Sequence, residues 1–115
     1  MTIYKRGNVI LVRFPNSDLI TYKKRPALII QDENVDTGLN QRLMAMITSN
    51  LVRTGETRVV VQKDSPAGKA MGLITDSVIV ADNIATIRER EIDKILGQCP
   101  CMPEVDAALR KALRL

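Results

Sequence analysis

The sequence predicts a mainly β fold, in which a small, strongly curved antiparallel sheet or barrel is followed by a C-terminal helix. Short apolar runs rich in β-branched residues recur between residues 8 and 87, and this composition is typical of strands. Polar loops rather than helical segments separate the runs, which favours antiparallel pairing over parallel crossover units. After residue 102 the apolar spacing changes to that of one helix face.

The β-forming residues are divided into five or six runs. Gly7 and Pro15 bound the first run, which is apolar enough for burial on both faces. The third run is rich in Leu and Met, but no N-cap precedes it and it ends in Thr-Ser-Asn, so we assign it to a strand. The predicted strands are Asn8–Phe14, Pro26–Gln31, Leu43–Ser49, Thr57–Gln62 and Asp76–Ala81, with Ile84–Ile87 continuing or bending the last one.

Three polar segments are predicted to be loops. Asn16–Lys24 is longer than a tight hairpin loop of about two to five residues, which makes it a candidate functional loop. Asp32–Gln41 is again long and polar. Lys63–Gly72 contains Ser-Pro and two glycines, which are strong turn signals.

The C-terminal segment is predicted to be an amphipathic helix that begins near Pro103. Proline suits the first helical turn, and Glu104 suits the positive end of the helix dipole. Basic residues occur near the other end, where cations are favoured. The apolar residues of one helix face are Val105, Ala108, Leu109, Ala112 and Leu113.

Length and composition predict one domain over residues 1–115, large enough to bury a core without metal or disulfide staples. No apolar run approaches the ~18 residues of a membrane span, and the N-terminus lacks the apolar stretch of a signal peptide. We therefore expect a cytoplasmic protein with no membrane association. A net charge of +4 is compatible with a polyanionic partner, whereas an aromatic content of 3% argues against a surface built on base stacking.

The chain contains no histidine, which excludes Ser-His, Cys-His and paired-His mechanisms. Cys99 and Cys101 are too close in sequence for an ordinary disulfide between distant segments. A metal site would need further ligands that histidine does not supply, so we expect neither a metal nor a cofactor. The two cysteines are interpreted as small apolar residues beside the start of the helix.

The segment from Tyr22 to Ile30 gives the strongest local indication of a site. Three cations end at Arg25 and run directly into a β-forming segment, which places a guanidinium where a loop becomes a strand. Guanidinium groups bind phosphate through a rigid fork of donors. Taken alone, however, the segment is explained more simply as a solvated basic loop before a core strand.

Other polar residues are also expected at strand ends. Thr48 and Ser49 follow one predicted strand, and Asp82 follows another. Each has a structural explanation as well, because Thr-Ser often ends a strand by bonding to the local backbone and Asp-Asn often forms a turn. These residues form a site only if the fold brings them together.

Several blocks of the chain occur in the order of a known family. They are Arg6–Val12, Lys24–Ile30, Ile47–Ser49, Asp76–Ile87 and the helical segment Glu104–Arg110. This ordered set resembles the MazF/PemK (Kid-type) toxins of type II toxin–antitoxin systems over nearly the whole chain. The resemblance implies a small SH3-like antiparallel barrel with a C-terminal helix (MazF/PemK/CcdB-like), assembled as a homodimer. It further implies a metal-independent, sequence-selective endoribonuclease that cleaves single-stranded RNA, mostly mRNA, and an acidic antitoxin that covers the RNA groove.

The resemblance also implies roles for individual residues. Arg25 matches the arginine of the family's Arg-Pro block and Thr48 the threonine of its Thr-Ser block, and these two residues carry the reaction in the family. Asp82 is a third candidate, either as a general base or as a structural residue. The expected RNA-binding residues are Ser17, Asp18, Tyr22, Lys23, Lys24, Ser49, Asn50 and Arg53.

The implied chemistry suits these side chains. The 2′-hydroxyl attacks phosphorus, a dianionic phosphorane forms, and the 5′-oxygen leaves. The guanidinium of Arg25 offers parallel donors and a permanent charge, and the hydroxyl of Thr48 offers one more donor. Because an arginine stays protonated near neutral pH and is therefore a poor general base, we hypothesise that Arg25 mainly stabilises the phosphorane, with protonation of the leaving oxygen as a second candidate role. Thr48 would hold the scissile phosphate.

The chain departs from the family in two places. Some members have an arginine two residues before the aspartate that matches Asp82, as an acid–base pair, whereas this chain has Val80. The family's loop before Arg25 commonly holds Gly and Gln or Glu, whereas this chain has Leu19–Lys24. Because such loops contact bases, this difference bears on the RNA sequence preference, and Tyr22 is a candidate for stacking on a base.

Three alternative functions stay open at the level of the sequence. A toxin on the same barrel that targets gyrase would carry its activity in an aromatic C-terminal tail, whereas this chain ends Leu-Arg-Leu without tryptophan. A catalytically inactive RNA- or antitoxin-binding barrel is disfavoured by the presence of Arg25 and Thr48. An unrelated barrel for protein interaction is supported only by the low aromatic content and the modest charge.

Overall fold

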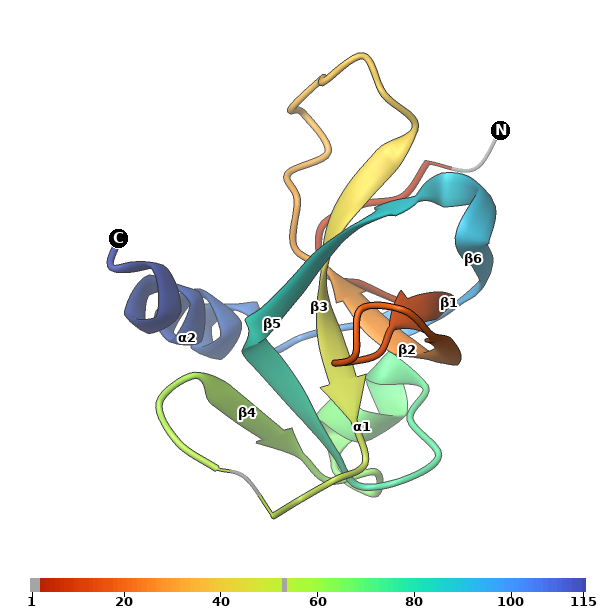
Figure 1. Ribbon diagram of the computed structural model, residues 1–115. Coiled ribbons are helices and arrows are strands. Elements are labelled where there is room, and N and C mark those ends of the chain that lie inside the picture. The colour runs from red at the N-terminus through yellow and green to blue at the C-terminus, as the bar shows by residue number, and fades with distance from the viewer. Residues whose placement is uncertain (1–2, 53) are drawn as a thin grey trace.

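The computed structural model describes residues 3–52 and 54–115 and shows a mainly β fold with a C-terminal helix, as predicted (Figure 1). An α-helix, α1, interrupts the strands, and a short 3₁₀ turn at Glu89–Glu91 precedes the last one. The elements are β1 (Asn8–Pro15), β2 (Tyr22–Ile29), β3 (Gln41–Thr48), β4 (Arg58–Val61), α1 (Pro66–Met71), β5 (Ser77–Arg88), β6 (Ile92–Gln98) and α2 (Met102–Leu113).

The strands form one antiparallel sheet in the order β4-β5-β3-β2-β1-β6. β5 is the longest strand, and it crosses the molecule beside β3 (Figure 1). The β3–β5 register shifts between Ala45 and Met46, and such a bulge increases the local bend and twist. Within the described ranges no pairing joins the edge strands β4 and β6, so the curved sheet is a barrel with an open seam.

Each face of the sheet has its own hydrophobic core. The first core lies under α2 and α1, and it includes Val9, Leu28, Ala45, Ile47, Ile79, Ala81, Met71, Val105, Ala108 and Leu109. The second core lies on the opposite face, where the sheet curls over itself, and it comprises Ile10, Val12, Phe14, Ala27, Ile29, Met44 and Ile87. Because successive strand residues point to opposite faces, the near-continuous apolar runs of β1 and β3 are explained by burial on both sides.

Arg6 connects α2 to the sheet. Its Nη2 lies 2.5 Å from Asp106 Oδ1 on the helix, and its Nε donates to the carbonyl oxygen of Ile30 at 2.8 Å. The helix begins at Met102, with Pro103 in its first turn. None of the helices in the described part of the chain is both long enough and apolar enough to cross a bilayer.

The structure corrects the predicted boundary of the second strand. β2 begins at Tyr22 rather than at Pro26, because its hairpin with β1 extends to the pair Pro15–Tyr22. Lys23 and Lys24 therefore lie in a strand and not in the predicted loop. Pro26 is accommodated inside this strand because the ladder with β3 starts only at Ala27, so its missing N–H costs no bond on that side.

The predicted loop Lys63–Gly72 contains a short helix, α1. The side chain of Ser65 caps it by accepting a bond from Gly68 N at 3.0 Å, and Pro66 occupies its first turn. Gly72 ends the helix with a φ of 71°, a conformation that glycine adopts without strain. The Ser-Pro and glycine signals were therefore helix caps rather than parts of an irregular loop.

The last strand, β6, forms from a segment for which the sequence predicts no element. Its polar residues Asp93 and Lys94 interrupt the apolar alternation, and two register shifts break its pairing with β1. Ile84–Ile87, by contrast, continues β5, and the register shift with β3 leaves residues 81–83 as a bulge that bends the strand before it.

Cys99 lies in the first core beside the start of α2, with its Sγ 3.2 Å from Cys101 Sγ. Burial raises the pKa of Cys99 from 9.0 to about 12. At pH 8 we therefore expect iodoacetamide to modify Cys101 well before Cys99 in the folded protein, since the thiolate is the reactive form. Mass spectrometry of peptides after timed labelling measures both rates.

The variant Cys101→Ser isolates Cys99 as a control, and its labelling in the native state and in guanidinium should differ strongly. Equal native rates at the two cysteines would contradict the burial argument. The same shift has a pH consequence: the unfolded thiol ionises from about pH 9 and the folded thiol only near pH 12. Stability should therefore fall between these values as pH rises.

Candidate active site

A groove of about 550 Å³ lies on the face of the sheet opposite α2. We call it the central groove, and it crosses the four neighbouring strands β2, β3, β5 and β4. Met46 and Thr48 line it from β3, while Ile47 between them packs in the first core. Its polar lining comprises Asn16, Ser17, Arg25, Thr48, Asn50, Arg58, Asp82 and Asn83.

Arg25 and Thr48 lie at equivalent positions on neighbouring strands. The β2–β3 ladder ends at the pair Ala27–Met46, and each of the two residues is two positions beyond that pair on its own strand. Arg25 Nη2 donates to Asn16 Oδ1 at 3.0 Å, and Nη1 contacts Met46 Sδ at 3.2 Å. Arg25 Nε is buried without a partner among the described residues. The structure thus places Arg25, Thr48 and the third candidate, Asp82, in one groove.

The β1–β2 loop holds Asn16, the residue that orients Arg25. Asn16 N donates to the carbonyl oxygen of Thr21 at 2.9 Å, and Asn16 Nδ2 donates to Thr21 Oγ1 at 2.9 Å. Thr21 Oγ1 in turn donates to Asp18 Oδ2 at 2.7 Å. Asp18 Oδ1 also accepts from the backbone N–H groups of Ile20 and Thr21, and the bond from Thr21 N–H is the main cause of the lowered pKa of Asp18.

Thr48 combines a structural contact with a hydroxyl that can still donate. Its Oγ1 accepts a bond from Asn50 N at 3.1 Å, and Asn50 Oδ1 accepts from Val52 N at 3.1 Å. These bonds turn the chain after β3, as local Thr and Asn bonding commonly does. A hydroxyl that accepts one bond still carries its own proton, so Thr48 can donate to a ligand in the groove.

Asp82 is paired with a residue that the sequence did not single out. Arg58 lies opposite Val80 in the β4–β5 register, and its Nη2 donates to Asp82 Oδ2 at 3.0 Å. Thr57 Oγ1 donates to the same oxygen at 3.2 Å. The hydrogen bond from Arg58 is the main reason why the pKa of Asp82 is lowered. The only signal for Arg58 in the sequence is a cation at the start of a valine run.

A second groove of about 450 Å³ shares Arg25 and Thr48 with the central groove. We call it the side groove, and its charged and hydroxyl lining also includes Lys23, Lys24, Ser49 and Lys94. Lys24 Nζ lies 3.1 Å from Asp93 Oδ2 on β6. Arg25 and Thr48 therefore form the wall between a polar groove and a basic one.

The remaining predicted RNA-binding residues lie elsewhere. Tyr22 is exposed outside both grooves, with the guanidinium of Arg13 5.8 Å from its ring centre. Asp18 lines neither groove and closes the β1–β2 loop as described above, so RNA contact by these two residues stays a prediction. Arg53 lies outside the described residues. In the part of the chain that the structure describes, no group of three or more His, Cys, Asp or Glu residues is placed to hold a metal ion.

Comparison with known families extends this picture. The family model described as PemK-like, MazF-like toxin of type II toxin–antitoxin system matches residues 5–113. The chain belongs to the PemK/MazF toxin family. The family predicted from the ordered sequence blocks is therefore confirmed. Comparison with curated protein sequences gives no match.

Solved structures of PemK/MazF toxins have the same fold. An endoribonuclease from a mycobacterial species, in complex with its cognate antitoxin, is 25% identical; the match covers 97% of this chain and 96% of that one, with a TM-score of 0.73. The Mycobacterium tuberculosis toxin MazF-mt6 is 27% identical, with 94% and 97% covered and a TM-score of 0.73. MazF from Deinococcus radiodurans is 18% identical over 100% of both chains, with a TM-score of 0.76, and this likeness concerns the fold alone.

Proposed function

We propose that this PemK/MazF toxin is a metal-independent, sequence-selective endoribonuclease that cleaves single-stranded RNA, mainly mRNA. The observation that supports the proposal most directly is the placement of Arg25 and Thr48 at the shared end of β2 and β3, on one groove. A permanent cation with parallel donors and a neighbouring hydroxyl suit a phosphodiester whose charge increases in the transition state. Two of the similar solved structures are those of mycobacterial endoribonucleases.

In the proposed reaction the 2′-oxygen forms a bond to phosphorus and the bond from phosphorus to the 5′-oxygen breaks. The 2′-hydroxyl loses one proton and the 5′-oxygen gains one, so the step yields a 2′,3′-cyclic phosphate and a 5′-hydroxyl without a co-reactant. Arg25 stabilises the non-bridging oxygens of the phosphorane, and Thr48 donates to the scissile phosphate. Asn16 and Met46 hold the Arg25 fork in place before the substrate arrives, which is the preorganisation that such stabilisation needs.

We further propose that RNA runs between the two grooves. Ser17 and Asn50 would contact it in the central groove, and Lys23, Lys24 and Ser49 in the side groove. The proposal includes cytoplasmic action, a homodimeric assembly and an acidic antitoxin as the inhibitor. A net charge of +4 suits both polyanionic partners, and one similar mycobacterial endoribonuclease was solved with its cognate antitoxin.

Incubation of the purified protein with mixed-sequence single-stranded RNA in excess EDTA tests the activity. We expect discrete cuts that leave 5′-hydroxyl and cyclic phosphate ends, identified by end-labelling and mass spectrometry. Folded wild-type protein that binds such RNA without cutting it would instead indicate an inactive binding barrel. Folded protein that neither binds nor cuts a broad set of sequences would contradict the proposal altogether.

Thr48→Val should reduce cleavage roughly 100-fold, because loss of one preorganised donor to a developing oxyanion costs about 10²–10³ in rate. Valine preserves the shape and β-propensity of the side chain, so the fold should be kept. Thr48→Ser retains the hydroxyl and should recover most of the lost rate. Single-turnover rates on a short RNA with one cut site measure all three proteins, and equal rates for Val and Ser variants would contradict the role of the hydroxyl.

A further inference from the structure

We propose that Arg58 is a second phosphate-binding residue of the central groove and that Asp82 positions it. This inference rests on the proposed RNA-cleaving function, and it gives Asp82 a role other than that of general base. Arg58, which is the cross-strand neighbour of Val80, supplies a guanidinium beside Asp82 from a different strand.

The position of Arg58 supports this role. It lines the central groove from β4, while Arg25 lines the same groove from β2. Two strands, β5 and β3, lie between them, so β4 and β2 are about 14 Å apart across the sheet at ~4.8 Å per strand. Two long side chains that reach inward from opposite sides can thus contact neighbouring phosphates of one RNA strand, with Thr48 between them.

Arg58 also has N–H donors beyond the one that binds Asp82. Its side chain is only 16% exposed, and its Nε is buried without a partner among the described residues. A guanidinium has five N–H donors, and the bond from Nη2 to Asp82 Oδ2 uses one of them. The remaining Nη donors can therefore bind a phosphate in the central groove.

The geometry at Asp82 suits a positioning role better than proton transfer. Asp82 Oδ2 already accepts bonds from Arg58 and Thr57, and these bonds favour the ionised carboxylate. A general base that acts near neutral pH works best with a pKa near that pH, whereas the pKa of Asp82 is shifted the other way. The side chain is 41% exposed, so the pair is open to the groove rather than sealed in the core.

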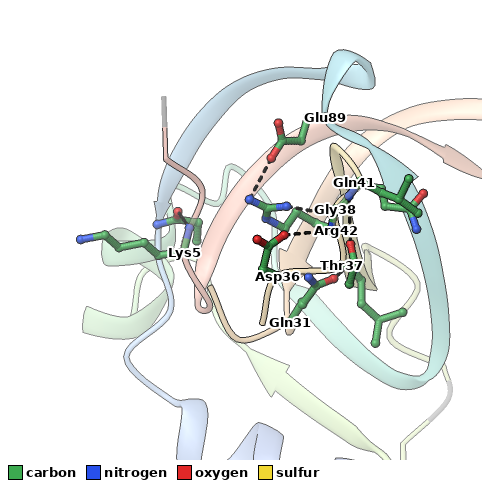
Figure 2. A network of polar contacts seen from close by, with 11 residues as sticks. Lys5, Gln31, Asp36, Thr37, Gly38, Gln41, Arg42 and Glu89 are labelled. Atoms are coloured by element: carbon green, nitrogen blue, oxygen red, sulfur yellow. Dashed lines mark hydrogen bonds and ion pairs between the residues drawn. The ribbon is translucent and has the colours of Figure 1, made fainter. Parts of the chain in front are cut away.

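Arg42 provides a matched control. It is also a mostly buried arginine of the sheet with a carboxylate partner, since its Nη2 lies 2.9 Å from Glu89 Oε1 (Figure 2). Its Nε is likewise buried without a partner in the described part of the chain. Arg42 pairs with Ile87 at the other end of β3 and lines neither groove. Loss of Arg42 therefore tests a similar ion pair without the proposed ligand.

The first experiment measures binding apart from cleavage. The probe is a single-stranded RNA with a 2′-deoxy sugar at the cut site, which binds but lacks the attacking hydroxyl. Arg58→Gln should weaken binding about tenfold and reduce the slope of log K against log salt by ~0.7, the value for one phosphate contact on a single strand. Arg58→Lys should retain most of the slope, and Arg42→Gln should change neither quantity.

Thermal melts show whether the two glutamine variants are folded. The inference is overturned if Arg58→Gln leaves both the affinity and the salt slope unchanged, or if Arg42→Gln changes them equally. The Arg58–Asp82 pair would then be only a structural ion pair between β4 and β5. The binding comparison does not depend on cleavage. It therefore tests phosphate binding by Arg58 even if the wild-type protein binds RNA without cleaving it. Wild-type protein that binds no RNA would overturn both proposals.

The second experiment tests Asp82 through a double-mutant cycle on cleavage of the all-RNA substrate. Asp82→Asn should reduce the rate less than tenfold, and it should have almost no further effect in the Arg58→Gln background, because Asp82 acts through Arg58. Loss of more than 100-fold on Asp82→Asn, with unchanged binding of the deoxy probe and the same loss in both backgrounds, would identify Asp82 as the base and overturn its positioning role.

Discussion

Replacement of Arg25 by lysine is expected to reduce RNA cleavage by roughly 1,000-fold, at the upper end of what loss of one preorganised donor costs. Lysine keeps the positive charge, so the charge alone does not account for the loss. The guanidinium is planar and holds its donors in a fixed fork, with Nη2 on Asn16 and Nη1 against Met46. An ammonium group keeps at most one of these contacts and presents a single point of charge to the phosphate.

Single-turnover cleavage at saturating enzyme isolates this effect from binding. Because charge is retained, the affinity for the 2′-deoxy probe should change by less than about tenfold while the rate falls by far more. Arg13→Lys is the control: Arg13 lies on β1 opposite Lys24 and lines neither groove, so its rate should stay at the wild-type value. Retention of most activity in Arg25→Lys would contradict the assigned role.

The location of Arg25 and Thr48 could be anticipated because each follows from a local pattern. Cations before a β-forming run place Arg25 near the start of a strand, and Thr-Ser-Asn places Thr48 at the end of another. Antiparallel pairing of consecutive strands then places the start of one strand beside the end of the next. Local patterns thus indicated the places of these two residues, whereas their roles came from the family resemblance and the sequence left their convergence open.

Arg58 could not be anticipated in this way. Its approach to Asp82 depends on the register between β4 and β5, which are separated by a loop and a helix in sequence. A shift of one residue would turn Arg58 to the other face, and nothing in the sequence fixes that register. A single sequence therefore does not reveal residues whose contacts depend on the register between strands that are distant in sequence.

The differences in the fold have the same origin. The pattern of Tyr22–Arg25 is that of a polar loop, yet the segment is a strand because its partner β1 continues opposite it. β6 has a polar pattern and depends on the free edge of β1 for its pairing. In both cases a neighbouring strand determines the structure, since strand propensity is weaker than context.

Phe14→Ala should lower the free energy of unfolding by about 3–5 kcal/mol, the usual cost of removing a buried aromatic ring and leaving a cavity. Phe14 is the only phenylalanine of the chain and is fully buried. It packs in the second core with residues of β1, β2, β3 and β5, so no single strand can move to close the cavity. Urea denaturation at a fixed protein concentration measures the change.

Phe14→Leu is the matched control, because it keeps most of the apolar volume and should cost much less than the alanine variant. The two variants should also differ in their rate of RNA cleavage. Phe14 directly precedes Pro15 and Asn16, and Asn16 holds the Arg25 fork, so a cavity beneath this corner should also loosen the fork. Under conditions where both variants are folded, Phe14→Ala should therefore cleave more slowly per folded molecule than Phe14→Leu. Equal rates would show that the second core stabilises the sheet without positioning Arg25.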